Sequence, residues 1–289
     1  MSKTISYVNG QLINSDVAAI SIFDHGFTVA DGVFETLKIE NGQTFALTRH
    51  LNRLAISCNG LGIKFPGLEL LEEAVSQVCK YNQAIELGRM RITVTSGEGP
   101  LGSDRLTGEP TLVISVAQQV AWPATSEILL MPWIRNEKSP LVSYKTTSYA
   151  ENVYALSIAK EHGFGEAIFL NSLGFLTEGT GSNVFLVKNQ KVLTPSAHCG
   201  LLKGVTRDLV IEWASNQFEV IECEISQEEF LAADEVFITS TTRDVSPVSK
   251  IATLDNSSRI NNVRTIQVGP ITQEIAKIFK AKSEQMSNP

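Results

Sequence analysis

The sequence predicts a mixed α/β (α+β) protein with a smaller N-terminal α/β domain and a larger C-terminal domain built on a barrel-like sheet. Short strand-like patterns alternate with amphipathic helical patterns along the chain, and no internal repeat is present. The 289 residues, 43% hydrophobic and 19% charged, are enough for two domains with buried cores. We place the N-terminal domain at residues 1–120 and the C-terminal domain at residues 121–289, with the linker and connector within about 119–143.

Hairpin and helix signals define the N-terminal domain. Asn9-Gly10 and Asn41-Gly42 each stand between strand-like runs and supply the positive φ angles of a tight turn, which predicts hairpins over 7–13 and 32–47. Apolar residues then recur at helical spacing, and β-rich runs follow them. The further elements expected here are helices at 48–61 and 68–81 and strands at 89–95 and 110–116.

Strands outnumber helices in the expected C-terminal domain. The predicted elements are a turn at 121–127, a polar connector at 133–143, helices at 148–162, 206–216 and 270–279, and strands at 166–170, 183–187, 191–194, 218–225 and 235–239. Strands that deliver a glutamate and several hydroxyls to loop ends suit a barrel-like sheet with peripheral helices. Residues 280–289 are polar and are expected to form a frayed tail.

Composition excludes several classes of partner and chemistry. A net charge of −7 and a pI near 5.2 argue against nucleic acid and anionic membranes. The sequence shows neither a secretory signal nor an apolar run that could span a bilayer. Its four cysteines lack paired spacing and its four histidines lack metal-ligand spacing, so reduced thiols and no metal are expected. A cytoplasmic enzyme is the simplest interpretation.

Two segments carry the chemistry. Residues 141–154 contain one lysine, Lys145, and residues 175–185 contain one acid, Glu178, followed by Gly179 and Gly181. Pyridoxal phosphate chemistry needs an amine that can form a Schiff base and a carboxylate that keeps the pyridine nitrogen protonated. Taken singly, Lys145 could be a surface lysine and Glu178 could cap a turn.

Further motifs occur in order along the chain, at Asp31–Lys38, His50–Leu54, Leu202–Asp208 and Phe237–Thr242. Together with the two segments above, they resemble the class IV aminotransferase family, the fold type IV pyridoxal phosphate enzymes, over nearly the whole chain. The resemblance implies a two-domain fold with a barrel-like C-terminal domain. It also implies pyridoxal 5'-phosphate as the cofactor.

The resemblance assigns roles to particular residues. Lys145 would be the catalytic Schiff-base lysine, Glu178 the partner of the pyridine nitrogen and Arg53 a ligand of the cofactor phosphate. Lys138 and Lys203 are nearby lysines, but neither occupies the Schiff-base position. Leu202 would pack against the cofactor ring.

The phosphate contacts have a physical rationale. Gly204 permits close backbone approach, and the amides of Val205 and Thr206 open a helix whose dipole favours an anion. The hydroxyls of Thr206 and Thr241 can donate to phosphate oxygens. Ser240 is a weaker phosphate candidate. The candidate substrate residues are Phe34, Arg91, Gly181 and Thr242.

No subfamily fits cleanly. D-amino-acid aminotransferases carry a tyrosine at the position of Phe34 and an arginine where this chain has Ser96. Branched-chain aminotransferases carry a tyrosine at the position of Ala150, but place an arginine at a strand position similar to Arg91. The Val-Phe-Glu-Thr-Leu run also resembles aminodeoxychorismate lyases.

We therefore expect an aminotransferase that interconverts amino acids (or amines) and keto acids. The alternative is an aminodeoxychorismate lyase that releases pyruvate and 4-aminobenzoate. A third hypothesis, a protein that binds the cofactor without turnover, is disfavoured because both Lys145 and Glu178 are retained. The expected partners are a small-molecule amino donor and keto acid, with no nucleic acid and no membrane, and the resemblance implies a homodimer.

Overall fold

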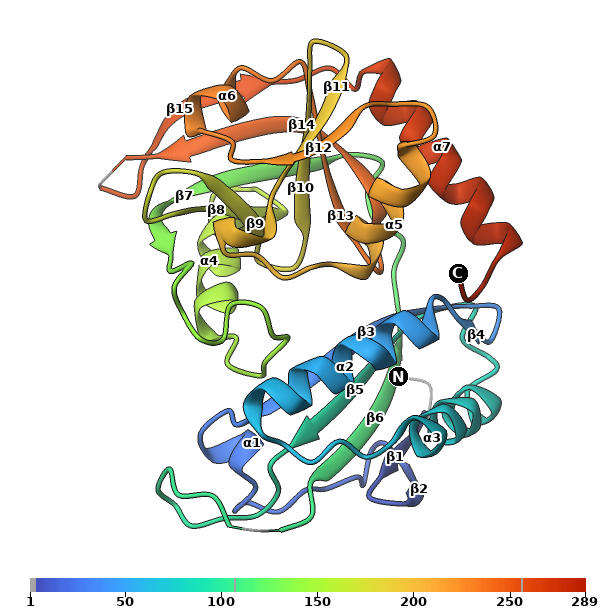
Figure 1. Cartoon of the computed structure of the whole chain (residues 1–289). Helices are drawn as coiled ribbons and strands as arrows, with labels where there is room; N and C mark the ends of the chain where they lie inside the picture. The colour runs from blue at the N-terminus through green and yellow to red at the C-terminus, as the bar shows by residue number, and fades with distance from the viewer. Residues whose placement is uncertain (1–3, 107, 256) are drawn as a thin grey trace. The chain divides into compact units, whose positions relative to one another are not determined.

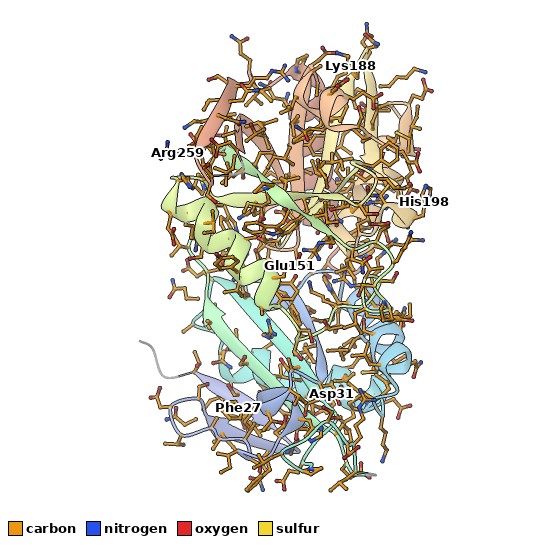
Figure 2. All side chains as sticks on the ribbon, turned by 90° about the vertical axis from the view of Figure 1, so that its left-hand side faces the viewer. Phe27, Asp31, Glu151, Lys188, His198 and Arg259 are labelled. Carbon is orange, nitrogen blue, oxygen red and sulfur yellow. The ribbon has the colours of Figure 1, made fainter. Side chains whose placement is uncertain are left out.

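Two compact units make up the protein in a computed structural model that describes residues 4–106, 108–255 and 257–289 (Figure 1). The first unit comprises Met1–Ala121, Tyr144–Ser148 and Met286–Pro289, and the second comprises Trp122–Ser143 and Tyr149–Gln285. Two segments that follow residue 121 in the sequence therefore pack with the first unit, and one of them contains Lys145. In Figure 2, Phe27 and Asp31 mark the first unit, and Lys188, His198 and Arg259 mark the second.

The first unit is an antiparallel sheet with the strand order β2-β1-β6-β5-β3-β4. Its elements are β1 (Ile5–Val8), β2 (Gln11–Asn14), α1 (His25–Thr28), β3 (Gly32–Glu40), β4 (Gln43–Thr44), α2 (Leu47–Leu61), α3 (Leu68–Tyr81), β5 (Leu87–Thr95) and β6 (Thr111–Gln118). The predicted hairpin turns are confirmed, because Asn9, Gly10, Asn41 and Gly42 all have positive φ, from 46° to 90°.

Helices α2 and α3 pack on the sheet, α2 against β3 and α3 against β1 and β6 (Figure 1). Leu54 of α2 and Val75 of α3 share a buried core with Leu37 of β3 and Ile92 of β5. Side chains alternate between the two faces of a strand, so the core residues leave Phe34 and its neighbours on the other face.

The second unit contains a closed β-barrel. Its elements are β7 (Ser126–Arg135), α4 (Ala150–Glu161), β8 (Glu166–Asn171), β9 (Leu176–Gly179), β10 (Asn183–Lys188), β11 (Lys191–Pro195), η1 (Ala197–Cys199), α5 (Val205–Ala214), β12 (Val220–Cys223), α6 (Gln227–Leu231), β13 (Glu235–Ser240), β14 (Asp244–Leu254), β15 (Ile260–Thr265) and α7 (Pro270–Gln285). The ring runs β10-β13-β14-β7-β8-β9 and returns to β10 through the pairing of Asn183 with Glu178. Strands β11 and β12 extend from β10, and β15 pairs with β14. The expected barrel-like sheet is thus confirmed.

Successive side chains along the barrel strands point to opposite faces of the sheet, and both faces carry a buried apolar cluster. Ile168, Val184 and Ile238 belong to one buried cluster, whereas Leu129 and Phe169 belong to a second cluster that includes residues of α4. Helices α5 and α7 pack against each other, and both contact β13 (Figure 1).

Strand β7 departs from the sequence prediction, which left residues 128–132 unassigned and treated residues 133–143 as a polar connector. The strand continues to Arg135. Its ladder with β8 is interrupted between Leu130 and Ile134, around Pro132, which has no amide hydrogen to donate. An irregularity in the ladder therefore accommodates Pro132 within the strand. Strands β14 and β15 were also not predicted.

The prediction of a frayed C-terminal tail is wrong. Helix α7 runs to Gln285, and the residues after it bind the start of α2. The Ala46 amide donates to the Ser287 carbonyl at 2.7 Å, and the Thr48 amide donates to Asn288 Oδ1 at 2.9 Å. Helix α2 lacks a cap from its own N-cap residue, Ala46, so Asn288 supplies one from a distant part of the chain.

Candidate active site

Lys145 is held on β3 by backbone hydrogen bonds. Its carbonyl accepts from the Phe34 amide at 2.9 Å, and its own amide donates to Ser57 Oγ at 3.2 Å. Two residues further on, the Thr147 amide donates to the Gly32 carbonyl at 2.8 Å. The Lys145 side chain is half-buried, and its Nζ lies 4.6 Å from the centre of the Phe34 ring. The main chain that carries this amine is therefore fixed to the sheet of the first unit.

Arg53 is bound by a buried acid that the sequence motifs did not assign. Its Nε donates to Glu35 Oε1 at 2.7 Å and its Nη2 donates to Glu35 Oε2 at 2.8 Å. His50 Nδ1 lies 2.7 Å from Oε2 of the same carboxylate, and both His50 and Glu35 have fully buried side chains. The Arg53 side chain is 13% exposed. The direction of the Arg53 guanidinium is therefore set from within the first unit.

The charges in this cluster follow from burial and contact. Burial raises the pKa of Glu35, but the charge of Arg53 and the hydrogen bonds from Arg53 and His50 outweigh it and hold that pKa well below its usual range. Burial lowers the pKa of His50, and the positive charges of Arg53 and Lys145 add to the lowering. We infer a neutral His50 that donates its Nδ1 hydrogen to an ionised Glu35 at pH 7.

Phe34 and Arg91 lie together on the sheet face opposite the helices. The Arg91 guanidinium carbon lies 3.6 Å from the centre of the Phe34 ring, and Arg91 Nε donates to Thr93 Oγ1 at 3.2 Å. Arg89, Arg91 and Thr93 share this face, because buried residues alternate with them along β5. Two cationic groups, Lys145 Nζ and Arg91, thus lie against the same aromatic ring.

Glu178 belongs to the second unit, where two donors hold its carboxylate. The Leu202 amide donates to Oε2 at 3.0 Å, and Arg135 Nη1 lies 3.4 Å from Oε1. The Arg135 guanidinium also stacks on Phe169, with 4.5 Å between its central carbon and the ring centre. Both the ion pair and the amide favour the anionic form of Glu178.

Gly204 is the N-cap of α5, and Val205 and Thr206 form the first turn of that helix. A Cβ at position 204 would lie 2.0 Å from Asn183 Oδ1, so no side chain fits there without displacement. Asn183 Nδ2 in turn donates to the Leu202 carbonyl at 2.9 Å. Gly204 makes no side-chain hydrogen bond to the helix, as expected of glycine, and the helix start therefore presents backbone amides.

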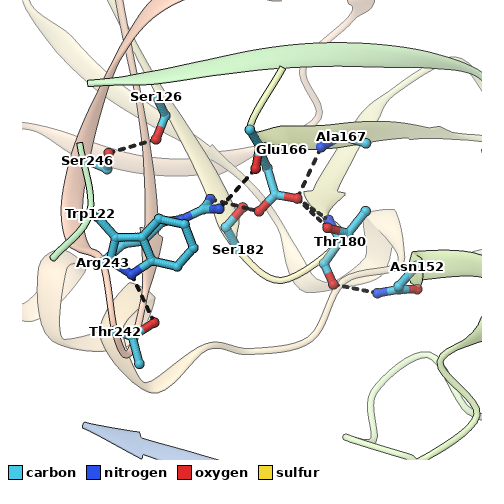
Figure 3. Close-up of polar contacts among 11 residues, drawn as sticks. Trp122, Ser126, Asn152, Glu166, Ala167, Thr180, Ser182, Thr242, Arg243 and Ser246 are labelled. Carbon is cyan, nitrogen blue, oxygen red and sulfur yellow. Dashed lines mark hydrogen bonds and ion pairs between the residues drawn. The ribbon is translucent and has the colours of Figure 1, made fainter. Parts of the chain in front are cut away.

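Ser240 ends β13, and Thr241 and Thr242 form the turn into β14. The Arg243 amide closes this turn by donating to the Ser240 carbonyl at 3.2 Å. Trp122 Nε1 donates to Thr242 Oγ1 at 3.3 Å (Figure 3).

Gly181 lies in the turn between β9 and β10, where a Cβ would meet no described atom within 4 Å. Packing within the described residues therefore does not explain the glycine at position 181.

The predicted residues fall into two groups. The first unit brings together Lys145, Phe34 and Arg91, and it also holds Arg53. The second unit holds the remaining predicted residues: Glu178, Gly181, Leu202, Gly204, Val205, Thr206, Ser240, Thr241 and Thr242. The competing lysines, Lys138 and Lys203, are exposed residues of the second unit.

Sequence reasoning missed the residues that orient these groups. A signal existed for Glu35, because it alternates with the apolar residues Val33, Leu37 and Ile39, and a charged residue on such a strand face needs a buried partner. Arg135 and Asn183 gave no comparable signal. Their partners, Glu178 and Leu202, lie far away in the sequence.

The sequence of this chain is similar to those of known proteins. The family model for class IV amino-transferases matches residues 32–251. The chain is 34% identical over 280 residues to the "Putative branched-chain-amino-acid aminotransferase" of Methanocaldococcus jannaschii, covering 95% of this chain and 94% of that protein. It is 29% identical over 286 residues to the aminodeoxychorismate lyase of Bacillus subtilis, covering 97% of this chain and 95% of that protein.

A solved structure shows the same fold. The branched-chain aminotransferase of Thermoproteus uzoniensis with norvaline superimposes with a TM-score of 0.87 at 26% identity, covering 96% of this chain and 94% of that one. Within the described residues, no helix is both long and apolar enough to cross a lipid bilayer. The family match and the shared fold show that the chain belongs to the class IV aminotransferase family.

Proposed function

We propose that this protein binds pyridoxal 5'-phosphate and transfers an amino group between an amino acid and a keto acid, with Lys145 as the catalytic residue. The observation that carries the proposal is the fixed carboxylate of Glu178, held by the Leu202 amide at 3.0 Å and by Arg135 at 3.4 Å. Such an anion is the partner that a protonated pyridine nitrogen requires. Membership of the class IV family supports the same cofactor.

Each proposed role follows from the chemistry of the group. When bound, the cofactor supplies an aldehyde carbon for the amino group and a ring that draws electrons from the reacting carbon. With the cofactor bound, Lys145 Nζ would anchor the aldehyde and would carry a proton to and from the reacting carbon. Glu178 would keep the pyridine nitrogen protonated, and Leu202 would pack against the ring.

The phosphate would be held by charge and by helix geometry. Arg53 supplies a charged guanidinium whose direction Glu35 fixes. The amides of Val205 and Thr206 at the start of α5 supply donors in the favourable field of the helix, where Gly204 leaves the backbone uncovered. The hydroxyls of Thr206, Ser240 and Thr241 complete the proposed set of phosphate ligands.

Substrate binding is assigned to the Phe34 face of the sheet. Arg91 can bind a substrate carboxylate, and its contact with Phe34 at 3.6 Å sets its direction. The substrates we propose are an apolar or small amino acid and a keto acid such as 2-oxoglutarate. Gly181 and Thr242 are proposed as further substrate contacts.

We also propose a homodimer, supported by an exposed apolar surface on the first unit. Ile22, Phe27 and Leu101 are 70%, 69% and 75% exposed (Phe27, Figure 2). Phe27 lies on α1 and Ile22 just before it, and a hydrogen bond of 2.8 Å between His25 Nε2 and the Pro100 carbonyl joins α1 to the loop of Leu101. Exposed apolar groups on adjoining segments are typical of a contact surface. Light scattering should give twice the mass of one chain, and Phe27→Asp should shift the protein toward the single chain. A single-chain mass for the wild-type protein would contradict the dimer.

Aminodeoxychorismate lyase activity is the second candidate, favoured by the 29% identity with the Bacillus subtilis lyase. The deciding assay offers aminodeoxychorismate to the holoenzyme and, separately, a panel of amino donors with 2-oxoglutarate. Glutamate formation from one or more donors is the expected result. Rapid 4-aminobenzoate formation with no glutamate from any donor would replace the proposed substrates with those of the lyase.

A further inference from the structure

Glu166, the first residue of β8, is a buried acid outside the predicted site, only 2% exposed. Its Oε1 accepts from the Thr180 amide at 3.1 Å and from the Thr180 hydroxyl. Its Oε2 accepts from Ser182 Oγ at 3.0 Å and from Arg243 Nη1 at 2.9 Å (Figure 3). One carboxylate therefore receives donors from two separate turns of the barrel.

The first of these turns, residues 179–182, directly follows Glu178. It is closed by the Gly179 amide, which donates to the Ser182 carbonyl at 2.7 Å. A Cβ on Gly179 would lie 2.5 Å from Ser182 Oγ and 3.2 Å from Glu166 Cδ, so a side chain here would displace Ser182 and crowd Glu166. The turn thus takes its shape around the Glu166 carboxylate.

The same turn is also linked to the Glu178 carboxylate, through Asn152 and Arg135. Asn152 Nδ2 donates to the Thr180 carbonyl at 2.6 Å, and Asn152 Oδ1 accepts from Arg135 Nη2 at 2.9 Å. Arg135 is the residue that pairs with Glu178. A continuous set of polar contacts therefore leads from the Glu178 carboxylate to Glu166.

The other turn is the one that carries Ser240, Thr241 and Thr242. Arg243 follows it directly, with a side chain only 8% exposed. Its Nη2 donates to the Gly165 carbonyl at 3.1 Å, and its central carbon lies 4.1 Å from the Trp122 ring centre. Trp122 also donates to Thr242 (Figure 3). Arg243 thus ties this hydroxyl-bearing turn to Glu166.

We propose that Glu166 is a positioning residue that fixes the separation between Glu178 and the hydroxyl-bearing turn at residues 240–242. The inference rests on the proposed function, in which Glu178 holds the pyridine nitrogen and the turn holds the phosphate of one rigid cofactor. Both ends of that cofactor can bind together only if the two turns stay at the matching distance. Because Thr180, Ser182 and Arg243 all donate to Glu166, an amide in its place would set an NH₂ group against either Thr180 or Arg243.

The test compares a ligand that uses both turns with ligands that use one. Apo-protein is titrated with pyridoxal phosphate, with pyridoxal and with inorganic phosphate. Glu166→Gln should weaken pyridoxal phosphate about tenfold or more, the effect of losing charge-assisted hydrogen bonds, and should weaken pyridoxal and inorganic phosphate much less. An equal loss for all three ligands, or unchanged affinity for pyridoxal phosphate, would overturn the inference.

A matched control comes from β13. Glu235 is 7% exposed and accepts from the Thr272 amide at 2.7 Å and the Ile271 amide at 3.2 Å, at the end of β13 opposite Ser240. Glu235→Gln should lower the melting temperature without changing the ratio of the three affinities. A change in that ratio equal to that of Glu166→Gln would show that any buried acid of the barrel has the same effect, and would also overturn the inference.

A second variant covers the case in which Glu166→Gln does not fold. Arg243→Lys keeps the positive charge but cannot bind both Glu166 and the Gly165 carbonyl as the guanidinium does. It should weaken pyridoxal phosphate selectively, by a smaller factor. Wild-type protein that does not bind pyridoxal phosphate would contradict the proposed function as well. Wild-type binding with unselective variants would contradict only the role of Glu166.

Discussion

Glu35 binds the guanidinium of Arg53 along one edge, through hydrogen bonds of 2.7 Å from Nε and 2.8 Å from Nη2. The acid lies on β3 and the arginine on α2, so the pair joins the sheet to the helix. Because the carboxylate is fully buried, its charge is balanced within the protein. Glu35 therefore fixes the orientation of Arg53, the arginine proposed to bind the cofactor phosphate, from within the protein.

Glu35→Gln should destabilise the protein by about 3–5 kcal/mol at pH 7, the usual cost of removing one partner of a buried pair. The folded-state pKa of Glu35 lies below its ordinary value of 4.5, so the unfolded chain binds the proton first as the pH falls. The stability that Glu35 supplies is therefore fully present above pH 4.5 and is lost as the pH falls below it. Urea unfolding at pH 7, 5, 4 and 3 should show the gap between wild type and variant narrowing below pH 4.5. A gap that stays constant would show that Glu35 is not the titrating group.

Lys145 should be the residue that holds the cofactor covalently. The purified holoenzyme should be yellow, and borohydride reduction followed by peptide mapping should label Lys145. The physical reason is that backbone bonds to Phe34 and Ser57 fix the chain that carries this amine. Label on Lys138 or Lys203, both exposed, would overturn the assignment.

Glu178→Gln and Arg53→Ala should separate proton transfer from cofactor binding. The neutral amide cannot hold the pyridine nitrogen protonated, so Glu178→Gln should slow the half-reaction about a hundredfold or more while the cofactor stays bound. Arg53→Ala removes a charge-assisted contact of about 1.5–3 kcal/mol and should chiefly raise the Kd of the cofactor. Stopped-flow absorbance and equilibrium titration measure the two quantities. The opposite pattern would mean that the roles are exchanged.

Arg91→Ala should impair the half-reaction with a dicarboxylic keto acid more than that with an apolar amino acid. Arg91 lies on the exposed face of β5 against Phe34 and can bind a substrate carboxylate. Arg89→Ala is the matched control, since Arg89 lies on the same face of the same strand. Single-turnover rates with each substrate measure the effect. Equal losses in both variants would assign the effect to the general positive charge of this face.

Asn288→Ala should cost about 0.5–2 kcal/mol of stability, the range for loss of a helix N-cap. The Thr48 amide at the start of α2 donates to Asn288 Oδ1 at 2.9 Å, and Asn288 Nδ2 donates to Thr48 Oγ1 at 2.8 Å. Asn288→Asp keeps the acceptor and adds a charge that the helix dipole favours, so it should retain most of the stability. Thermal unfolding compares the three proteins. Equal melting temperatures for wild type and Asn288→Ala would show that the tail does not cap the helix.

Sequence patterns predicted those parts of the fold that local residues specify. Asn9-Gly10 and Asn41-Gly42 require positive φ at two adjacent positions, and helical spacing identified α2 and α3, so these elements were found close to their observed bounds. Strand β7 was missed because Pro132 interrupts an otherwise apolar run. The strand accommodates this proline because its pairing with β8 is broken at that point.

The residues of the candidate site were likewise predicted only in part. Motifs identified the residues proposed to face the cofactor, such as Lys145 and Glu178. They did not identify the residues that orient them, because those contacts join distant positions. Arg243 and Glu166 are 77 residues apart, and Asn288 and Thr48 are 240 apart. A single sequence contains no local pattern that pairs such residues, so only the folded chain reveals them.

The pairing of Glu178 with Asn183, which closes the barrel, limits how this enzyme can evolve. Inserting or deleting a residue between these positions would shift the register of β9 against β10 and uncover strand edges that favour aggregation. Libraries that insert or delete residues between positions 178 and 183 should therefore yield mostly insoluble protein, whatever substrate is selected. Adaptation to new substrates should instead accumulate at positions whose backbone is not part of this seam, such as Arg91 on the first unit.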